Sequence, residues 1–416
     1  MNFACVDVGS TFTKAVIVDG EGGLVAAADH RTTSDEDVLV GLDNAVKATG
    51  VEPDELLVCS SAGGGLRLAV VGYEMLVTAQ AGYRVGLSAG AKVVHVAAGK
   101  LDAQGLSDVK AAKPDVILLV GGADGGDEET ILHNAGRLKT TSTPIVLAGN
   151  ACAVPELKEI LPRAVVAENV LPAIGKLNPG PARAAIREVF LRHVIGGKHL
   201  SKGPRFARLV KGATPDAVLT GVELLATMVT GDLLVVDVGG ATTDVYSVLK
   251  QVDEGDVAGV LAAARTVEGD LGMRWSSPGV VAAAIQEKFI DEPILTVTDP
   301  SAASFETDER LAGLAVAVAL RRHARGEALE PGGPRRGGRD LRAVELVVGS
   351  GGVLRHRPPA QAGAILETGL RDDAGGWPLP RSPHVVIDSS YVLAVAGLLA
   401  AEHREVAVSL LESALT

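Results

Sequence analysis

Two stretches of the chain place an aspartate, glycines and hydroxyl side chains at the same spacing. Residues 3–18 read FACVDVGSTFTKAVIV and residues 233–248 read LLVVDVGGATTDVYSV, and they align without a gap. In each stretch an apolar run ends in Asp-Val-Gly, a short polar turn follows, and a second apolar run begins. This pattern predicts two β-hairpins. Hairpins that recur 230 residues apart indicate a duplicated domain.

The two turns have the groups that a polyphosphate requires. Consecutive backbone N–H groups of a small-residue turn can converge on phosphate oxygens, and hydroxyl groups add further donors. An aspartate at a strand end offers a hard oxygen ligand to a hydrated Mg²⁺. An ordinary Asp-x-Gly hairpin accounts for either motif alone, but two in register favour a nucleotide site. The predicted phosphate contacts are Gly9, Ser10, Thr11, Thr13, Lys14, Gly239, Gly240, Thr242 and Thr243, and the predicted metal ligands, also counted as catalytic, are Asp7 and Asp237.

A third glycine-rich turn follows an apolar run near the C-terminus. Residues 344–352 read VELVVGSGG, and Gly349, Ser350, Gly351 and Gly352 would let a ribose or a flat ring approach the backbone, so we predict the adenosine contact there. The sequence contains neither GxxxxGK(S/T) nor a GxGxxG that opens a helix, which disfavours P-loop and dinucleotide-binding folds.

One acidic turn follows the second hairpin and is a candidate for catalysis. Glu268 lies in Glu-Gly-Asp with Asp270, and a carboxylate there could orient an attacking water. A solvated surface turn explains these acids equally well. Asp244 could face the metal or cap its own turn.

Apolar runs alternate with helical stretches over the first part of the chain. A helix is expected at 34–48 and strands at 55–60, 92–98, 115–121, 144–149 and 164–168, which predicts a mainly parallel, doubly wound sheet. Residues 178–228 and 255–325 have mostly helical patterns, and 326–340 is expected to be a basic surface loop to which we attach no function. A strand at 384–388 and a helix from about 391 complete the chain.

Composition argues against nucleic-acid binding and indicates the cellular compartment. The net charge of −12 and the 3% aromatic content disfavour nucleic-acid binding. Three cysteines without CxxC spacing suit a reducing compartment. No signal peptide or membrane span is visible, so we expect a cytoplasmic protein without a membrane partner.

Together these motifs resemble the actin/hexokinase/heat-shock-chaperone ATPase superfamily. More narrowly, the chain is similar to the MutL (GlmL) family, accessory proteins of adenosylcobalamin-dependent glutamate mutase and related carbon-skeleton mutases. The matching stretches are DVGSTFTK at 7–14, CSSAGGGLR at 59–67, LLVGGADGGD at 118–127, DVGGATTDV at 237–245, TVEGDLGMR at 266–274 and VVGSGGVL at 347–354.

The resemblance implies an α/β fold, a duplicated actin-like ATPase with a nucleotide cleft between two domains and a doubly wound insertion. The expected parts are the first half of domain I at 1–65, the insertion at 66–175, a helical connection at 176–230, and domain II at 231–416 with a C-terminal return to domain I. It also implies an ATP-binding, ATP-hydrolysing helper of a cobalamin-dependent mutase, with ATP or ADP and Mg²⁺ bound.

Other interpretations stay open at this point. The same clamp could serve a small-molecule kinase or a non-hydrolysing, actin-like binding or filament protein. The glycines of 118–127 could form a second ligand or partner site, although a plain strand-to-helix connection is favoured. The chain has no DxHxxG, the pattern that carries the cobalt-ligating histidine in many such mutases, so it is not expected to be their catalytic cobalamin subunit.

Overall fold

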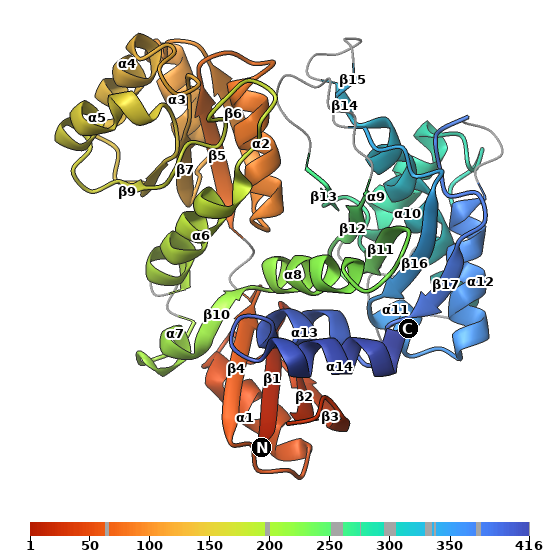
Figure 1. Cartoon of the computed structure of the whole chain (residues 1–416). Coiled ribbons are helices and arrows are strands. Elements are labelled where there is room, and N and C mark those ends of the chain that lie inside the picture. The colour runs from red at the N-terminus through yellow and green to blue at the C-terminus, as the bar shows by residue number, and fades with distance from the viewer. Residues whose placement is uncertain are drawn as a thin grey trace. The chain divides into compact units, whose positions relative to one another are not determined.

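A computed structural model describes most of the chain, and two compact units are distinguished within it (Figure 1). The described residues are 1–62, 66–195, 200–250, 261–274, 276–294, 305–328, 335–336, 338–371 and 376–415. Unit 1 comprises Met1–Thr220, Gln251–Ala264 and Ala394–Ala407, and unit 2 comprises Gly221–Lys250, Arg265–Leu393 and Val408–Thr416.

The predicted first hairpin opens the first sheet of unit 1. β1 (Asn2–Val8) pairs antiparallel with β2 (Phe12–Asp19), and the register places Asp7 opposite Lys14. The strand order is β10-β4-β1-β2-β3, in which β10, β4 and β1 run parallel. The other elements here are β3 (Leu24–Arg31), α1 (Val38–Ala48), β4 (Glu55–Ser60), α7 (Arg205–Leu209) and β10 (Val210–Ala213).

The second sheet of unit 1 is the predicted doubly wound insertion. All its strands run parallel, in the order β6-β5-β7-β8-β9. Its elements are β5 (Arg67–Gly72), α2 (Thr78–Ser88), β6 (Lys92–Ala98), α3 (Ala103–Ala111), β7 (Val116–Leu119), α4 (Glu129–Leu138), β8 (Ile145–Leu147), a 3₁₀ turn (Ala151–Ala153), α5 (Val154–Ile160) and β9 (Val165–Val166). Apolar side chains of α3, α4 and α5 share one core cluster, whereas those of α2 belong to another. Helices therefore cover both faces of this sheet (Figure 1).

A mostly helical segment follows the insertion. It consists of α6 (Pro179–Val189), a π-helical turn (Phe190–Ile195), α7, β10 and α8 (Thr214–Ala226). The boundary between the two units falls inside α8, after Thr220.

Unit 2 contains the second predicted hairpin. β11 (Asp232–Val238) pairs antiparallel with β12 (Thr243–Val248), and the sheet order is β13-β12-β11-β16-β17. The elements that follow along the chain are β13 (Ala263–Glu268), α9 (Ser277–Gln286), α10 (Phe305–Arg325), β14 (Glu327–Ala328), β15 (Arg335–Arg336), β16 (Val344–Ser350), α11 (Gly352–Arg355), α12 (Pro359–Leu370), β17 (His384–Ile387), α13 (Val392–Leu399) and α14 (Arg404–Leu415). Of these, the first two residues of β13 and the segment Ala394–Ala407, which spans most of α13 and the start of α14, belong to unit 1. Part of the predicted loop 326–340 thus forms the short β14–β15 pair, and 329–334 and 337 lie outside the described residues.

The first sheet of unit 1 and the sheet of unit 2 have the same topology. Read from its other edge, the unit 2 sheet runs β17-β16-β11-β12-β13, which matches β10-β4-β1-β2-β3 strand for strand. In both, a central hairpin is flanked on one side by two parallel strands. The predicted fold class is confirmed: a duplicated, actin-like α/β fold with a doubly wound insertion.

Besides the short β14–β15 pair, four further strands were not predicted. β3 and β5 were missed, β10 lies in the segment 178–228 that was predicted as mostly helical, and β13 lies in 255–325, for which helices were predicted. Within the described residues, no helix is both long and apolar enough to cross a membrane.

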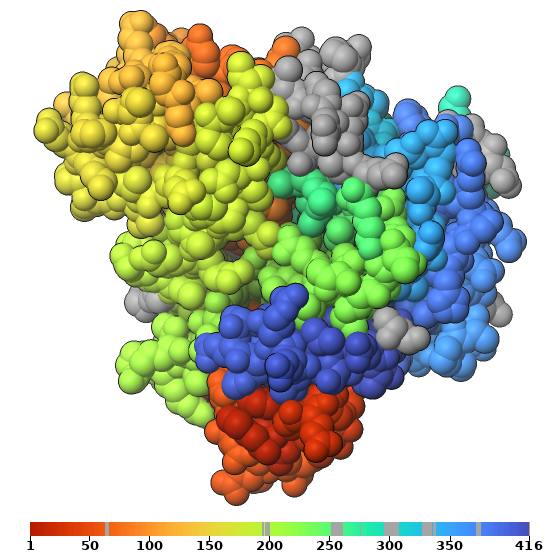
Figure 2. Space-filling view, viewed as in Figure 1, coloured from red at the N-terminus to blue at the C-terminus, as the bar shows by residue number. Residues whose placement is uncertain are grey.

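The C-terminal part of unit 1 packs on its first sheet. His403 contacts the ring of Phe3 at 4.4 Å between ring centroids and forms a 2.9 Å hydrogen bond with Glu55. In the space-filling view, dark blue atoms of the C-terminal part border red atoms of the N-terminal part (Figure 2). These contacts fix the ends of β1 and β4 that lie away from the Asp7 turn.

Candidate nucleotide site

The turn of the first hairpin is held by Thr32, which follows β3. Thr32 donates its hydroxyl to the carbonyl of Gly9 at 2.9 Å and its backbone N–H to the carbonyl of Thr11, also at 2.9 Å. A trans peptide points its N–H opposite to its C=O. The N–H of Ser10 therefore points away from Thr32, as a phosphate-binding turn requires.

Among the predicted phosphate contacts in this turn, two are exposed and one hydroxyl is engaged elsewhere. Ser10 and Thr11 are exposed. Thr13 is buried and shares a 2.9 Å hydroxyl–hydroxyl hydrogen bond with Thr32, so it stabilises the turn from its buried side. A Cβ at Gly9 would lie 2.7 Å from the carbonyl oxygen of Phe12, so the turn needs glycine at this position.

Asp7 is buried at the end of β1, with 5% of its surface exposed. Its Oδ1 accepts a 2.5 Å hydrogen bond from the hydroxyl of Thr214 and lies 3.7 Å from the thiol of Cys59. Its Oδ2 lies 3.7 Å from the ammonium of Lys14. Burial raises the pKa of the Cys59 thiol well above its ordinary value, and the charge of Asp7 adds to the rise, so Cys59 stays a protonated donor. The two carboxylate oxygens of Asp7 thus face different surroundings.

The second hairpin repeats the geometry of the first. Gly239 donates its N–H to the carbonyl of Thr242 at 2.9 Å, as Gly9 does to Phe12 at 3.1 Å. Residues that follow β13 then bind the turn from one side. Met273 and Arg274 donate their N–H groups to the carbonyls of Gly239 and Gly240 at 3.0 and 2.8 Å. By the same peptide geometry, the N–H groups of Gly240 and Ala241 point away from these residues.

Hydroxyl groups of the second turn serve its own structure. Thr243 is buried and donates to the carbonyl of Leu271 at 2.5 Å. Thr242 donates to Asp244 at 3.0 Å, and Asp244 also accepts two hydrogen bonds from Arg265, at 2.6 and 3.0 Å. Asp244 therefore caps the turn, one of the two roles considered for it. Asp237, at the end of β11, is less buried than Asp7.

The third glycine-rich turn lies beside the second hairpin within unit 2. β16 pairs with β11, and Ser350 stands opposite Asp237 and is buried. Gly351 has φ +99°, and a Cβ there would lie 2.2 Å from the carbonyl oxygen of Val238 and 2.8 Å from Oδ1 of Asp237. Only glycine allows this approach. The predicted adenosine turn and the predicted metal ligand of unit 2 are therefore neighbours.

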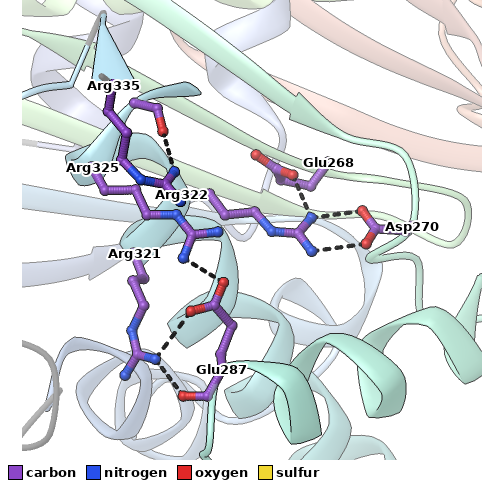
Figure 3. A network of polar contacts seen from close by, with 8 residues as sticks. Glu268, Asp270, Glu287, Arg321, Arg322, Arg325 and Arg335 are labelled. Atoms are coloured by element: carbon purple, nitrogen blue, oxygen red, sulfur yellow. Dashed lines mark hydrogen bonds and ion pairs between the residues drawn. The ribbon is translucent and has the colours of Figure 1, made fainter. Parts of the chain in front are cut away.

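Glu268 forms an ion pair that the sequence did not predict (Figure 3). Arg322 of α10 donates to Oε2 of Glu268 at 2.7 Å and to both carboxylate oxygens of Asp270, at 2.8 and 2.9 Å. Partial burial alone would raise the pKa of Asp270, but the hydrogen bonds and charge of Arg322 outweigh it and the pKa lies below its ordinary value. The Glu-Gly-Asp turn is thus held by one guanidinium, and its two acids are not freely solvated.

The neighbouring arginines of α10 bind the end of α9. The Glu287 carboxylate forms ion pairs with Arg321 at 3.2 Å and with Arg325 at 2.5 Å (Figure 3). Arg321 also lies over the ring of Phe289 at 4.0 Å. These contacts fix the packing of α10, from which Arg322 extends.

Polar groups of the loop after β7 form hydrogen bonds with neighbouring side chains of the insertion. It leaves the sheet between β5 and β7, where the strand order reverses and where ligands bind in many such folds. Asn169 donates to the carbonyl of Gly122 at 3.0 Å and to Asp124 at 2.8 Å, and the amide oxygen of Asn150 accepts from the N–H of Gly125 at 3.1 Å. This pattern supports the interpretation of 118–127 as a structural connection.

One cluster of unit 1 has side chains of metal-ligand type. Glu55, Glu402 and His403 can bring three ligand atoms within 4.8 Å of one another. However, Lys211 lies 3.1 Å from Glu402, and His403 binds Glu55 directly. Because the Lys211 ammonium already compensates Glu402, we assign this cluster a structural role.

Comparisons with known proteins identify a family that matches nearly the whole chain. The family model described as "MutL protein" matches residues 3–415. The chain is 35% identical to "Protein MutL" of Clostridium tetanomorphum over 459 aligned positions, which cover 99% of this chain and 98% of that protein.

Solved structures give weaker likenesses. A ROK family glucokinase from Streptomyces griseus, solved with glucose and AMPPNP, is 11% identical with a TM-score of 0.35 and covers 98% of each chain. The activator of 2-hydroxyisocaproyl-CoA dehydratase from Clostridium difficile, solved with ADPNP, is 10% identical with a TM-score of 0.32 and covers 99% of this chain and 98% of that one. Both TM-scores are below 0.5, so the strand order of the two matching sheets, rather than these likenesses, identifies the fold. From the match along nearly its whole length and the 35% identity, this chain belongs to the MutL family.

Proposed function

We propose that this protein binds ATP with Mg²⁺ and hydrolyses it as a helper of an adenosylcobalamin-dependent carbon-skeleton mutase. The observation that supports the nucleotide site most is the repeated hairpin. In both turns the carbonyls are bound by other parts of the protein, Thr32 in one and the N–H groups of Met273 and Arg274 in the other, so N–H groups point outward. The mutase as partner is supported by the family to which the sequence motifs belong.

Each residue of the proposed site has a defined task. N–H groups of the two turns bind phosphate oxygens, together with the hydroxyls of Ser10 and Thr11 and the charge of Lys14. Asp7 and Asp237 hold Mg²⁺, which they fit as hard oxygen ligands at strand ends, and the ion would neutralise phosphate charge. Gly349–Gly352 contacts the adenosine. Glu268, held by Arg322, orients the attacking water.

The proposed parts of the molecule follow the domain limits expected from the sequence. Residues 1–65 and the C-terminal return form one nucleotide-binding half, 231–416 supplies the other, and 66–175 is the insertion. In this proposal, nucleotide exchange changes the affinity for the mutase, as linkage requires of a coupled helper.

The test is reactivation of a damaged mutase. A mutase inactivated with a modified cobalamin is incubated with the protein, ATP, Mg²⁺ and fresh adenosylcobalamin, and mutase activity is followed. We expect recovery that requires ATP and is absent with Asp237→Ala. Asp340→Ala, which changes an exposed aspartate paired with Arg342, should behave as wild type.

Three outcomes would contradict the helper role. Recovery without ATP, or no recovery and no nucleotide-dependent binding with any mutase, would each overturn it. ATP turnover that rises with one metabolite, with transfer of the phosphoryl group to it, would indicate a kinase instead.

A further inference from the structure

Thr214 is the closest side-chain partner of Asp7 among the hydrogen bonds given above. Its hydroxyl oxygen lies 2.5 Å from Oδ1 of Asp7. That distance is at the short end for a hydroxyl that donates to a carboxylate, the kind of hydrogen bond that is about twice as strong as a neutral one. Thr214 is 9% exposed and Asp7 is 5% exposed, so little water competes for this contact.

Strand topology brings Thr214 to Asp7 from 207 residues away. β4 lies between β1 and β10, and all three run parallel, so their carboxyl ends meet at one edge. The registers place Asp7 beside Cys59 and Cys59 beside Gly212, with Thr214 two residues further on, at the start of α8. The hydroxyl therefore reaches the carboxylate from a fixed backbone position.

The contacts of Asp7 are divided between its two oxygens. Thr214 and the thiol of Cys59 both lie on the Oδ1 side, whereas Lys14 lies on the Oδ2 side. Cys59 is a weak donor at 3.7 Å, so Thr214 provides the main hydrogen bond on the buried side. A carboxylate held this way has its rotation about the Cβ–Cγ bond fixed.

We propose that Thr214 is a positioning residue that fixes the Asp7 carboxylate so that Oδ2 is turned toward Lys14 and the phosphate-binding turn. This inference rests on the proposed ATP and Mg²⁺ site. A purely structural role at the start of α8 is the alternative, and it predicts an effect on stability but none specific to the metal.

The experiment compares ATP binding with Mg²⁺ and with EDTA by calorimetry, and adds Mn²⁺ binding to the ATP complex followed by electron paramagnetic resonance. Thr214→Val removes the hydroxyl at nearly constant shape, and Thr214→Ala is a second variant should valine disturb folding. Thr214→Ser keeps the hydroxyl. Thr220→Val is the matched control, because Thr220 lies on the same helix and donates its hydroxyl to the carbonyl of Asp216 at 2.9 Å.

We expect Thr214→Val and Thr214→Ala to weaken ATP binding ~10-fold or more with Mg²⁺, the scale of a lost hydrogen bond to a charged group. Binding in EDTA should change by less than about twofold, and Thr214→Ser and Thr220→Val should resemble wild type. Equal loss with and without metal, or no loss, would overturn the inference while leaving the proposed function standing. A wild-type protein that binds no ATP would overturn the proposed function itself.

Discussion

A single ion pair, with Arg322, restricts the candidate catalytic residue Glu268. Glu268 is mostly buried, with 14% of its side chain exposed, and Arg322 binds it from α10. The guanidinium restricts the carboxylate to few orientations, which a residue that positions water needs. A solvated surface turn would leave the side chain free to move.

The Glu268→Gln variant tests this role. An amide of nearly the same size cannot accept the proton from water, so we expect ATP affinity to be kept and hydrolysis to fall ~10²-fold or more. Steady-state hydrolysis and calorimetry measure the two effects. Glu367→Gln, which changes a glutamate with 56% of its side chain exposed, should leave both unchanged. An unaltered hydrolysis rate for Glu268→Gln would assign Glu268 to the structure of its turn.

Gly351 lies in the turn that we propose contacts the adenosine, and its backbone conformation requires glycine. In Gly351→Ala the φ of +99° and the contact with the Val238 carbonyl would both be strained, so we expect unit 2 to lose ~1–3 kcal/mol of unfolding free energy or more. Gly352→Ala is the matched control, because a Cβ there meets no atom within 4 Å. Urea denaturation compares them. Equal stabilities would show that the turn relaxes without cost.

Among the secondary-structure elements, α10 contacts three parts of unit 2: β12, β13 and the residues around Arg274. Asp308 binds Arg274 through two hydrogen bonds of 2.7 and 2.8 Å, Arg322 binds the Glu-Gly-Asp turn, and His323 is hydrogen-bonded to Ser247 at 2.8 Å and to Thr266 at 3.0 Å. α10 thereby connects β12, β13 and the segment that binds the second hairpin. Its packing determines how precisely that hairpin is held.

His323 makes the stability of this element depend on pH. Burial, with a smaller contribution from the charge of Arg339, lowers the pKa of His323 from 6.5 to about 3. Between these values the unfolded chain binds a proton that the folded state does not, so the free energy of unfolding falls as pH falls below about 6.5. The slope from this group approaches about 1.4 kcal/mol per pH unit.

Denaturation of His323→Gln between pH 5 and 7 measures this contribution, because the variant has no imidazole to titrate. We expect a shallower dependence on pH than in wild type, by up to about one proton. His384→Gln, at an exposed position, should keep most of the wild-type slope. Identical slopes in wild type and His323→Gln would contradict the buried, neutral state of His323.

The elements that sequence patterns missed share a physical cause. β3 reads LVAAADHR and β13 reads AARTVE, and alanine and charged residues have low strand propensity, so pairing in the sheet decides their structure. β10 has only four residues and starts directly after α7. By contrast, β4 and β6 are mostly apolar, and their predicted limits are those observed.

The residues of the candidate site also fall into two groups, those that the sequence indicated and those that only the structure revealed. Local spacing was sufficient to propose Asp7, Asp237 and the three turns as site residues, because each motif is contiguous. Thr214 and Arg322 act across 207 and 54 residues, and nothing near them in the sequence marks their partners. The sequence around Thr214 predicts only the start of a helix, because Pro215 follows it. Such distant partners require the topology.

At the scale of the whole molecule, duplication is the main feature. One hairpin repeat in the sequence predicted two sheets of equal topology, and the matching strand orders confirm it. Two of the boundaries between the units fall inside α8, after Thr220, and inside α13, after Leu393, and the others follow Lys250, Ala264 and Ala407. α8 begins directly after β10, whereas residues 388–391 separate α13 from β17.

The central claim is that both hairpins bind one nucleotide through their aspartates, and calorimetry with ATP and Mg²⁺ tests it most directly. The comparison is wild type, Asp7→Ala, Asp237→Ala and, as control, Asp43→Ala, which changes an exposed aspartate paired with Arg205. We predict one ATP per chain, affinity about tenfold or more weaker in each hairpin variant, and wild-type affinity in the control. Equal affinity in all four proteins would contradict the account.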